Sequence, residues 1–519
     1  MKYNFIEIEK KWQHFWEKNK TFSVKQDSSK PKFYVLDMFP YPSGSGLHVG
    51  HPLGYIASDI YARYKILNGY NVLHPMGYDS FGLPTEQYAI ETGIHPAKAT
   101  AINTRRYDKQ LKKMGFAYDW DRKILTSDSS FYRWTQWIFR RLYDSFYSLK
   151  EDKAMSISHL IDEFKLNGFS KDFAFSSSKI YPFTNVEWMN FSDSQKENIL
   201  HKFRLAFLTE TTVNWCEELG TVLANDEVKD GFSERGGYPV IKRKMKQWAL
   251  RITAYSNRLL EDLNKIDWPS SIKEIQKNWI GKSTGASIFF KIDEKENASI
   301  EVYTTRPDTI FGVTFLVLSP EHPIIKEFIE SKHVSAYVKE CKQKTEIERK
   351  KSKSITGVFS GMYALHPITN KKMPIWISDY VLIDYGTGAI MAVPCGDQRD
   401  WSFANKFDLE IKNIFEGVDI SKSSHEEREI ILKDSDFVNG LSSNEASQKI
   451  VSFLESKKLG FSRTNFKQRD AIFSRQRYWG EPFPVYYEDD TPKIFPDNET
   501  PTLPEIDEYK PTNEGLPPL

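Results

Sequence analysis

Two histidines, His48 and His51, stand three residues apart in the turn-rich stretch FPYPSGSGLHVGHP, residues 39–52. On one helical turn both rings point to the same side. Imidazole N–H groups can donate to phosphate oxygens as negative charge builds in a transition state. Gly50 between them has no Cβ, so the backbone there can approach a flat ligand closely. The pattern indicates a phosphate-handling site, and a capped turn with two surface histidines is the alternative.

The elements around this stretch must position the histidines. FYVLDM at 33–38 has the pattern of a strand, and LGYIASDIYARYKILNGY at 53–70 has that of a helix. Strand-like and helix-like patterns alternate up to about residue 149, which predicts an α/β fold with a parallel sheet. Ligands bind beyond the carboxyl ends of parallel strands, and N–H groups at a helix start favour anions. The stretch 39–52 lies at such a place.

The amino-acid composition and periodicity of the sequence then change twice. Residues 151–210 are rich in Ser, Phe and Lys with weaker periodicity, so we expect an insertion there. From 284 to 400 β-branched runs such as SIEVYTTRPDTIFGVTFLVLS predict a separate β-rich domain.

Composition limits the class of protein. A chain of 519 residues suggests two to four domains, and a net charge of +1 gives no sign of a nucleic-acid partner except through a local surface. The three cysteines are scattered and predict no disulfide framework. The charged N-terminal helix pattern lacks the apolar core of a signal peptide, and no run of about 18 apolar residues predicts a membrane span. We therefore expect a cytoplasmic protein with no membrane partner.

Several motifs together resemble one family. HVGH is similar to the H-I-G-H signature of class I aminoacyl-tRNA synthetases, and FPYPSGSGLHVGHPLGY resembles the form found in leucyl-tRNA synthetases of bacterial type. HPMGYDSFGLPTEQYA (74–89) and FSRQRYWGEPFPV (473–485) resemble the second strand region and the segment where the chain re-enters the catalytic domain. The resemblance covers essentially all of the chain apart from 151–205. It implies a Rossmann-like class I synthetase catalytic core with an inserted β-rich editing domain.

The resemblance also implies an activity. Members of the family activate leucine with ATP, release pyrophosphate and transfer leucine to its tRNA, so the implied partners are leucine, ATP, Mg²⁺ and leucine tRNA, with the protein as a monomer. By position, His48 and His51 contact ATP phosphates and Gly50 underlies the adenine. The residues that line the implied leucine site are Phe39, Tyr41 and Asp79. A carboxylate such as Asp79 beside a strand end can pair with a substrate ammonium, and a loop cap is its alternative.

A second, hydrolytic site is implied in the β-rich region. A binding pocket discriminates only about 10- to 200-fold between amino acids that differ by one methylene group. Near-isosteric amino acids that are attached to the tRNA by mistake must therefore be removed by hydrolysis. TTRPDTIFG (304–312) and YGTGAIMAVPCGDQRDWSFA (385–404) resemble the editing domain of leucyl-tRNA synthetases. The resemblance implies that Thr304, Thr305 and Arg306 line the site, that Thr309 is the size gate and that Asp400 holds the ammonium. Read without the family, these are ordinary strand threonines and a solvated turn.

The chain departs from the family pattern in several places. Many relatives have His where this chain has Gly396, which weakens any role for an imidazole there. Cys216 stands alone where relatives often carry a zinc knuckle, and the His48–His51 pair lacks metal-binding partners, so no zinc is expected. No lysine-rich signature loop occurs before Leu519, which suggests the N-terminal part of a synthetase. We expect residues 1–281 to form the first part of the catalytic domain, with an insertion at about 151–250. Residues 282–465 are expected to form the editing (connective polypeptide) domain. In residues 466–519 the chain is expected to return to the catalytic domain, truncated before the lysine-rich signature loop.

Three alternatives stay open. The first is a valyl- or isoleucyl-tRNA synthetase, against which FPYPSG argues. The second is a truncated fragment that acts only as an editing deacylase. The third is an inactive tRNA-binding fragment, for which basic runs such as KRKMKQWALR (242–251) would provide the contacts, although such runs are more often solvated faces.

Overall fold

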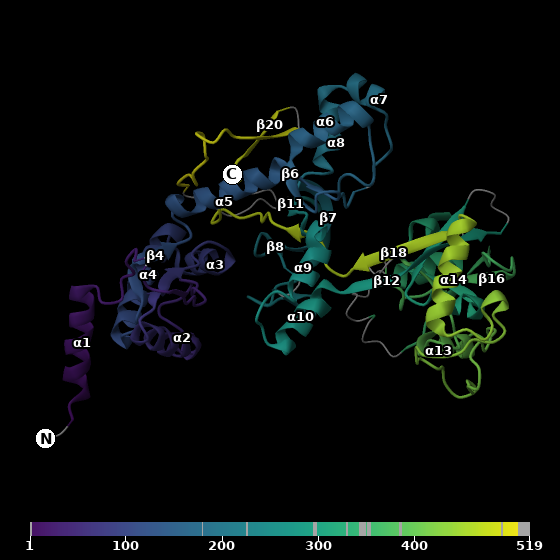
Figure 1. Ribbon diagram of the computed structural model, residues 1–519, viewed down its shortest axis with the longest axis horizontal. Coiled ribbons are helices and arrows are strands. Elements are labelled where there is room, and N and C mark those ends of the chain that lie inside the picture. The colour runs from purple at the N-terminus through teal and green to yellow at the C-terminus, as the bar shows by residue number, and fades with distance from the viewer. Residues whose placement is uncertain are drawn as a thin grey trace. The chain divides into compact units, whose positions relative to one another are not determined.

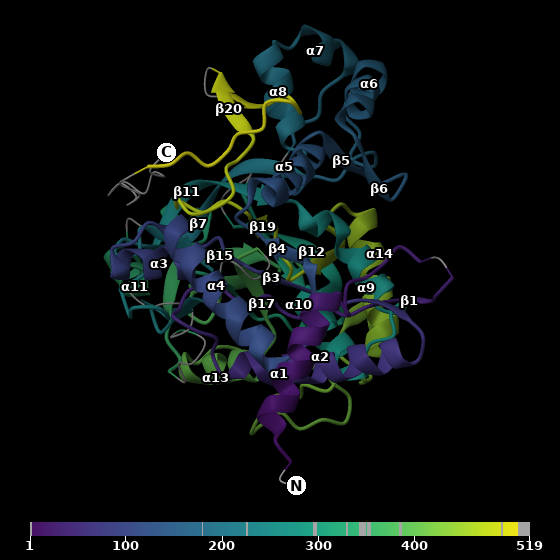
Figure 2. The same ribbon diagram turned by 90° about the vertical axis from the view of Figure 1, so that its left-hand side faces the viewer.

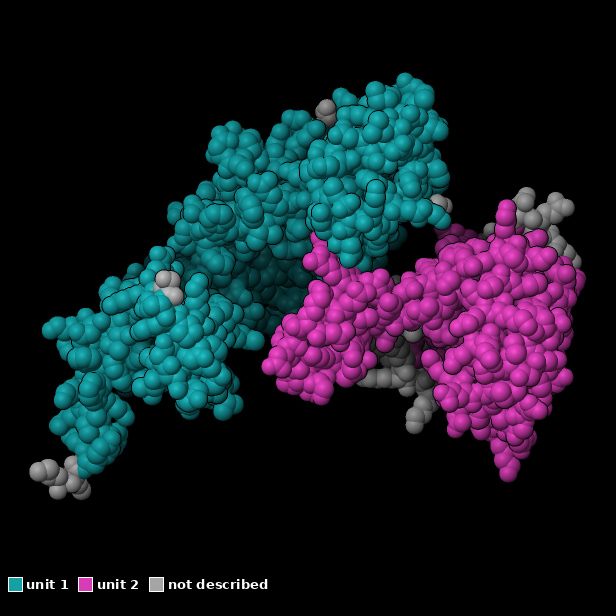
Figure 3. Space-filling view, viewed as in Figure 1, with its two compact units in different colours: residues 1–254, 470–519 teal, residues 255–469 magenta. Residues whose placement is uncertain are grey.

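A computed structural model describes residues 3–27, 29–178, 180–224, 227–293, 298–327, 331–341, 349, 354–382, 387–488 and 491–506. The chain divides into two compact units, Met1–Ala254 together with Asp470–Leu519, and Tyr255–Arg469 (Figure 3). Residues 507–519, at which the expected truncation falls, lie outside the described residues. Within the described part, no helix is both long enough and apolar enough to cross a bilayer.

The first unit begins with alternating helices and strands (Figure 1). β1 pairs with β2 and β3 with β4, each time in parallel, so the predicted α/β character is confirmed. The elements are α1 (Phe5–Asn19), β1 (Lys32–Tyr34), α2 (Gly50–Leu67), β2 (Asn71–Leu73), β3 (Pro75–Tyr78), α3 (Leu83–Thr92), α4 (Pro96–Met114), β4 (Asp119–Leu125) and α5 (Ser129–Tyr143).

A small helical cluster follows α5 (Figure 2). It consists of an antiparallel hairpin and three helices: β5 (Ser145–Ser148), β6 (Lys153–Ser156), α6 (Ile157–Asn167), α7 (Asn185–Asn190) and α8 (Asp193–His201). Phe146, Phe164, Trp188 and Phe203 form its aromatic core, so the Phe-rich composition of 151–210 serves local packing.

The remaining strands of the first unit bring distant segments of the chain together. A four-stranded sheet has the order β19-β11-β7-β8. Its strands are β7 (Ala206–Cys216), β8 (Thr221–Leu223), β11 (Ile241–Leu250) and β19 (Ala471–Ile472), and the short pairs are β9 (Val228–Lys229) with β10 (Phe232–Ser233) and β20 (Val485–Glu488) with β21 (Thr491–Ile494). Through β19, the segment after residue 470 pairs antiparallel with β11.

The second unit is built on one seven-stranded sheet, which confirms the predicted β-rich part. The strand order is β13-β12-β15-β16-β14-β17, with β18 on β12, and β13 also contacts β17. Helix α14 packs on β18 and on the turn η3 (Figure 1). Apolar residues from strands and helix, including Ile288, Phe290 and Ile450, form the core between them.

The bounds of this unit's elements are η2 (Ile252–Tyr255, across the boundary), α9 (Ser256–Asp262), α10 (Ser270–Ile280), β12 (Lys282–Ile292), β13 (Ser299–Thr304), η3 (Pro307–Gly312), β14 (Phe315–Leu318), η4 (Pro323–Glu327), α11 (Lys332–Cys341), β15 (Val358–Leu365), β16 (Lys372–Ile377), β17 (Ala389–Ala392), α13 (Gln398–Lys406), η5 (Asp436–Val438), α14 (Ser443–Ser456) and β18 (Gly460–Phe466). α14 starts with a capping box in which Ser442 and Glu445 bond each other's backbone N–H groups.

Candidate active sites

The two histidines lie where the sequence predicts, at the start of α2. Val49 precedes the helix and provides no side-chain cap, but the first-turn N–H groups are occupied, because His51 donates to the His48 carbonyl at 3.0 Å, Gly50 donates to the His48 ring and residue 52 is a proline. His48 Nδ1 accepts from the backbone N–H of Gly50 at 3.0 Å. His51 Nδ1 lies 3.1 Å from the His48 backbone nitrogen and 3.2 Å from the His48 carbonyl oxygen, so the tautomer of His51 decides whether it accepts or donates. The exposed His48 ring therefore carries its proton on Nε2, as a donor that faces away from its own turn.

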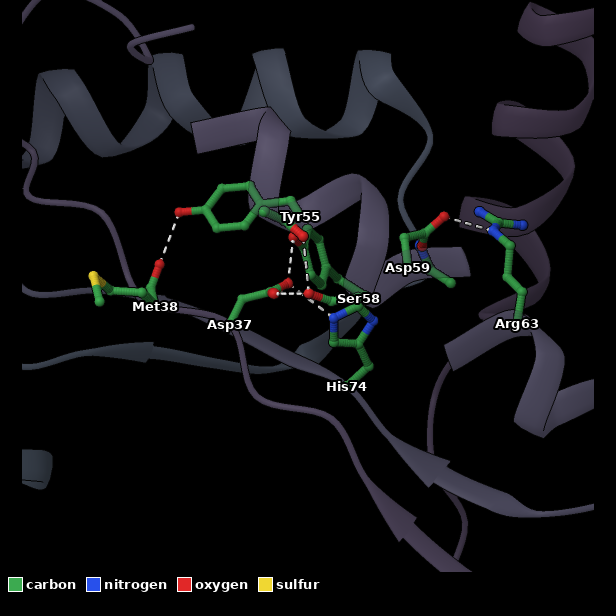
Figure 4. A network of polar contacts seen from close by, with 10 residues as sticks. Asp37, Met38, Tyr55, Ser58, Asp59, Arg63 and His74 are labelled. Carbon is green, nitrogen blue, oxygen red and sulfur yellow. Dashed lines mark hydrogen bonds and ion pairs between the residues drawn. The ribbon is translucent and has the colours of Figure 1, made fainter. Parts of the chain in front are cut away.

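Beneath this turn, the buried carboxylate of Asp37 connects four elements (Figure 4). It accepts hydrogen bonds from His74 Nε2 at 3.0 Å, from the Tyr118 hydroxyl at 2.9 Å and from the Ser58 hydroxyl. Burial alone would raise the pKa of Asp37, but these hydrogen bonds outweigh burial and lower it. The ionised Asp37 thus fixes the end of the 33–38 segment against α2.

Two further contacts fix α2 itself. The Tyr55 hydroxyl donates to the Met38 carbonyl at 2.8 Å (Figure 4). One turn later, Asp59 accepts from the Ala117 N–H at 2.5 Å and from Arg63 Nε at 2.7 Å. The helix that begins with the histidines is therefore held along its buried side by hydrogen bonds.

The candidate leucine site follows β3. Asp79 is half-buried, and its N–H donates to the Pro40 carbonyl at 3.2 Å, which links the loop after β3 to the 39–52 stretch. Burial raises the pKa of Asp79, and a long hydrogen bond from Thr126 at 3.5 Å opposes the shift only in part. Burial raises the pKa of Tyr41 as well, and the negative charge of Asp79 adds to it. Asp79 is thus joined through its backbone to Pro40, the residue before Tyr41.

Glu481, in the segment after residue 470, is an acidic residue that sequence reasoning did not single out. Burial raises the pKa of Glu481, and the charge of Asp79 raises it further. This influence makes Glu481 a candidate to add negative charge near Asp79. Only its position within the FSRQRYWGEPFPV block could have indicated Glu481, because Asp79 lies far away in the sequence.

The third predicted residue of this site, Phe39, packs its ring on the backbone of β3. A Cβ added to Gly77 would stand 2.5 Å from Phe39 Cε2 and 2.8 Å from the Ile124 carbonyl. Glycine is therefore required at position 77 for the ring to lie where it does.

A cavity of about 430 Å³ opens beside Tyr41. Its apolar wall includes Leu83, Leu219 and Leu223, and its charged rim includes Glu227. The wall is formed largely by residues 219–235, which the sequence analysis did not associate with the leucine site.

The segment after residue 470 supports the loop that carries Asp79. Trp479 donates its backbone N–H to Glu86 at 2.7 Å and its indole N–H to the Ser80 carbonyl at 2.6 Å. Gly82 donates its N–H to the Trp479 carbonyl at 3.0 Å. Burial raises the pKa of Glu86, although the hydrogen bonds from this segment and the charge of Arg477 oppose it.

Cys216 is buried with Leu83, Leu219 and Leu223 in an apolar cluster. In the described ranges, no group of three or more His, Cys, Asp or Glu side chains could hold a metal ion. The sequence-based expectation that no zinc is bound stays a prediction.

In the second unit, the threonine-rich stretch folds into a tight turn after β13. Thr304 Oγ1 accepts from the Arg306 N–H at 3.0 Å, and Thr309 Oγ1 donates to the Arg306 carbonyl at 2.8 Å. The Arg306 guanidinium pairs with the buried Asp308 at 2.8 Å. Thr309 is buried and Thr305 is exposed, so Thr305 presents the most accessible hydroxyl of the turn.

Asp400 lies on α13 in a buried position. It accepts hydrogen bonds from the Tyr380 hydroxyl at 2.9 Å and from the Val393 N–H at 2.9 Å. Burial, followed by the charge of Asp397, raises the pKa of Asp400 to about 7. A carboxylate with this pKa is only partly ionised near neutral pH, which sequence reasoning did not anticipate.

The turn after β13 and the segment before α13 lie side by side. A Cβ on Gly312 would stand 3.2 Å from Cys395 Sγ, and β13 contacts β17. Burial raises the pKa of the Cys395 thiol to about 11, and the positive charge of Arg306 acts against this shift. The structure therefore brings the 304–312 and 393–400 segments of the predicted editing site together.

Gly396 directly precedes Asp397 in the second segment of the predicted editing site. A Cβ at this position would stand 3.3 Å from the Phe415 ring. The Phe415 ring thus leaves little room for a side chain, which gives a physical reason for glycine here.

Comparisons with known proteins find similar sequences for both units of the chain. A family model described as "tRNA synthetases class I (I, L, M and V)" matches residues 11–162, and one described as "Leucyl-tRNA synthetase, editing domain" matches residues 277–455. The chain is 54% identical over 525 residues to the leucine–tRNA ligase of Christiangramia forsetii, with 100% of this chain and 54% of that protein covered. For the leucine–tRNA ligase of Flavobacterium psychrophilum the identity is 52% over 546 residues, with 100% and 57% covered.

A solved structure also resembles the chain. It is the crystal structure of the ternary complex of Agrobacterium radiobacter K84 agnB2 LeuRS-tRNA-LeuAMS, which matches with a TM-score of 0.71 and 30% identity over 98% of this chain and 54% of that chain. The chain therefore spans about half the length of the curated relatives and of the solved structure that it matches.

Proposed function

We propose that this chain, which belongs to the leucyl-tRNA synthetase family, carries the leucine-activating site and the editing site of a leucine–tRNA ligase. The observation that carries the proposal is the position of the exposed His48 at the start of α2, in a loop that is hydrogen-bonded to the one carrying Asp79. Phosphate donors and an ammonium acceptor are what joining leucine to ATP requires.

In the activation step, Asp79 binds the leucine ammonium and Glu481 adds negative charge to the same site. A leucine carboxylate oxygen attacks the α-phosphorus of ATP, and the bond from that phosphorus to pyrophosphate breaks. His48 and His51 donate N–H groups to phosphate oxygens whose negative charge grows. Gly50 lets the adenine approach the backbone, and Phe39 and Tyr41 line the leucine site.

Magnesium fits this site through the substrate. The described residues provide no cluster of side chains for it, and Mg²⁺ commonly binds through one or two carboxylates and the substrate's phosphates. When bound, the ion neutralises part of the phosphate charge.

The editing site lies in the second unit by this proposal. Thr304, Thr305 and Arg306 line it, with the exposed Thr305 hydroxyl directed to the aminoacyl ester. Thr309 limits the size of the side chain that enters. Asp400 binds the substrate ammonium, which requires the carboxylate to be ionised.

The proposed domains follow from these roles. We assign 1–281 to the first part of the catalytic domain, with an insertion at about 151–250, 282–465 to the editing domain and 466–519 to the return to the catalytic domain. A cytoplasmic location is part of the proposal, and the buried, unoxidised thiols of Cys216 and Cys395 support it.

Two assays test the proposal. The first measures ATP–pyrophosphate exchange with leucine, isoleucine or valine. The second measures deacylation of correctly charged and mischarged leucine tRNA. We expect weak exchange that prefers leucine, and hydrolysis of mischarged tRNA only. A preference for valine or isoleucine in exchange, or equal hydrolysis of both tRNAs, contradicts it.

An editing-only function is the second candidate. The second unit has its own sheet and core, so hydrolysis can persist where activation does not. Hydrolysis of mischarged tRNA together with no leucine-dependent exchange, even in the presence of the rest of a relative's polypeptide, would favour this candidate.

A further inference from the structure

The turn η3, which carries Thr309, is fixed internally by its own hydrogen bonds. All of its residues, Pro307–Gly312, are buried. The Thr309 N–H and the Thr309 hydroxyl both donate to the Arg306 carbonyl, at 3.1 and 2.8 Å. These two bonds and the branched Cβ leave the Thr309 side chain little freedom relative to its own backbone. The place of this side chain within the second unit therefore depends on what holds the backbone of η3.

His366 holds this backbone at one point. It lies buried in the turn between β15 and β16, where its N–H donates to the Lys371 carbonyl at 2.9 Å. Its Nδ1 accepts from the N–H groups of Ile368 and Thr369 at 3.2 and 3.1 Å. The ring proton is therefore on Nε2, which donates to the Ile310 carbonyl at 3.0 Å. Burial lowers the pKa of His366, so the ring keeps this neutral form near pH 7.

Lys412 holds the backbone of η3 at the next residue. This lysine follows α13 in the chain and is half-buried. Its ammonium donates to the Phe311 carbonyl at 2.9 Å and to the Asp434 carbonyl at 3.0 Å. Hydrogen bonds from a charged donor are stronger than those between neutral groups. The lysine therefore ties the end of η3 to the segment that precedes η5.

The two bonded carbonyls belong to the residues directly after Thr309. The last carbonyls of a helical turn lack donors within the turn, so donors from elsewhere must satisfy them when they are buried. Ile310 and Phe311 receive theirs from two separate segments of the second unit. Helix α14 also packs on η3, and a Cβ on Gly312 would stand 3.2 Å from Cys395 Sγ. The backbone beside Thr309 is thus held from several directions.

A size gate needs this kind of support. A side chain that excludes one amino acid and admits another of almost the same size must keep its place to well within the width of a methyl group. Thr309 cannot do so by its own rotamer alone if the turn that carries it can shift. The two external donors to η3 are therefore placed to control which amino acids enter the proposed editing pocket.

We propose that His366 and Lys412 are positioning residues for editing, which hold the η3 backbone so that Thr309 excludes leucine from the pocket. This inference rests on the proposed function, because it assumes that Thr309 is the gate. The two side chains act through the Ile310 and Phe311 carbonyls and need not touch the substrate. Loss of either donor should relax the gate, so that correctly charged leucyl-tRNA is hydrolysed as well as the mischarged form.

The test uses the full chain and three variants of the two donors. Lys412→Met removes the ammonium and keeps a long side chain, whereas Lys412→Arg retains a cationic donor. His366→Phe keeps a flat ring beside Phe311 and removes both ring nitrogens. The control is Lys371→Met in the turn that carries His366, because the Lys371 ammonium pairs with the exposed Glu410 at 2.6 Å.

Deacylation of both charged tRNAs, thermal unfolding and hydrogen exchange at the η3 amides are measured for each protein. In Lys412→Met and His366→Phe, hydrolysis of leucyl-tRNA and exchange at the Thr309 and Val313 amides should each rise at least ~10-fold, because a donor to a buried carbonyl is lost. Hydrolysis of mischarged tRNA should change little. Lys412→Arg and Lys371→Met should behave as the wild type. Lys412→Met should add little to Thr309→Ala, in which the gate is already open.

Folded Lys412→Met and His366→Phe variants that still spare leucyl-tRNA, or that exchange the η3 amides at the wild-type rate, overturn the proposal. A parallel fall of both hydrolyses with a lower unfolding temperature also overturns it, because the two residues would then serve stability alone. Failure of the wild type to hydrolyse mischarged tRNA contradicts the proposed function and, with it, the gate. In that case the exchange rates still decide whether His366 and Lys412 hold the turn.

Discussion

Replacing Asp400 by Asn should separate the stability of the second unit from its editing activity. The buried carboxylate has a pKa of about 7 against an ordinary value of 3.8. This difference means that the folded unit binds the proton more tightly than the unfolded chain does. The stability contributed by protonated Asp400 is complete below about pH 4 and is lost as the pH rises through about 7.

The magnitude follows from the shift. Three pKa units correspond to at most about 4 kcal/mol, and relaxation of the site lowers this to about 1 to 3 kcal/mol. An asparagine retains an oxygen for the Val393 N–H, and its amide can donate to the Tyr380 hydroxyl, which can accept. Asp400→Asn should therefore stabilise the second unit by about 1 to 3 kcal/mol at pH 8 and by much less at pH 5.

The same change should abolish hydrolysis of mischarged tRNA, since a neutral amide cannot pair with an ammonium. Denaturant unfolding of the full chain at pH 5 and pH 8 gives the stability, and deacylation from pH 6 to 9 gives the activity. Wild-type hydrolysis should fall as the pH drops through about 7. A comparison variant is Asp397→Asn, which removes the neighbouring charge and should therefore lower the pKa of Asp400 and shift the fall in hydrolysis to lower pH. Loss of stability at pH 8 in Asp400→Asn, or unchanged hydrolysis, would refute the reasoning.

Three further predictions concern the other site residues. In a complete enzyme, His48→Ala or His51→Ala should each lower leucine-dependent exchange by about 100-fold or more, because a transition-state donor is lost; wild-type exchange in a folded double variant would sink this assignment. Thr309→Ala should enlarge the editing pocket and permit hydrolysis of correctly charged leucyl-tRNA, and continued protection of that tRNA would remove the gate role. Metal analysis should find no stoichiometric zinc, because Cys216 packs among leucines; one tightly bound zinc per chain would overturn this.

The local patterns of the sequence predicted a large part of the fold. Alternating patterns predicted parallel strand pairing, which the structure has in β1–β2 and β3–β4, and β-branched runs predicted a separate β-rich domain, which the structure builds on a seven-stranded sheet. His48 and His51 lie at a loop-to-helix junction as expected, because turn residues and helical periodicity are both local signals.

What the sequence did not predict depends on contacts over long distances. The burial of Asp400 follows from Tyr380 and the Val393 backbone, and the Asp37 network needs His74 and Tyr118 from separate elements. An acidic residue in a short motif looks accessible until the elements packed on it are known. For the same reason, the sequence did not indicate that the charge of Asp79 acts on Glu481.

The discontinuity of the first unit has a consequence for how the chain folds. β19 must pair with β11 across all of Tyr255–Arg469. Closing a loop of roughly 200 flexible residues costs about 2 kcal/mol more than closing one of roughly 15, and such non-local pairing slows folding. The second unit reduces this cost once folded, because β12 near its beginning pairs with β18 near its end, with Lys282 opposite Phe466. We therefore expect the inserted unit to close its own sheet before the two separated segments of the first unit pair with each other.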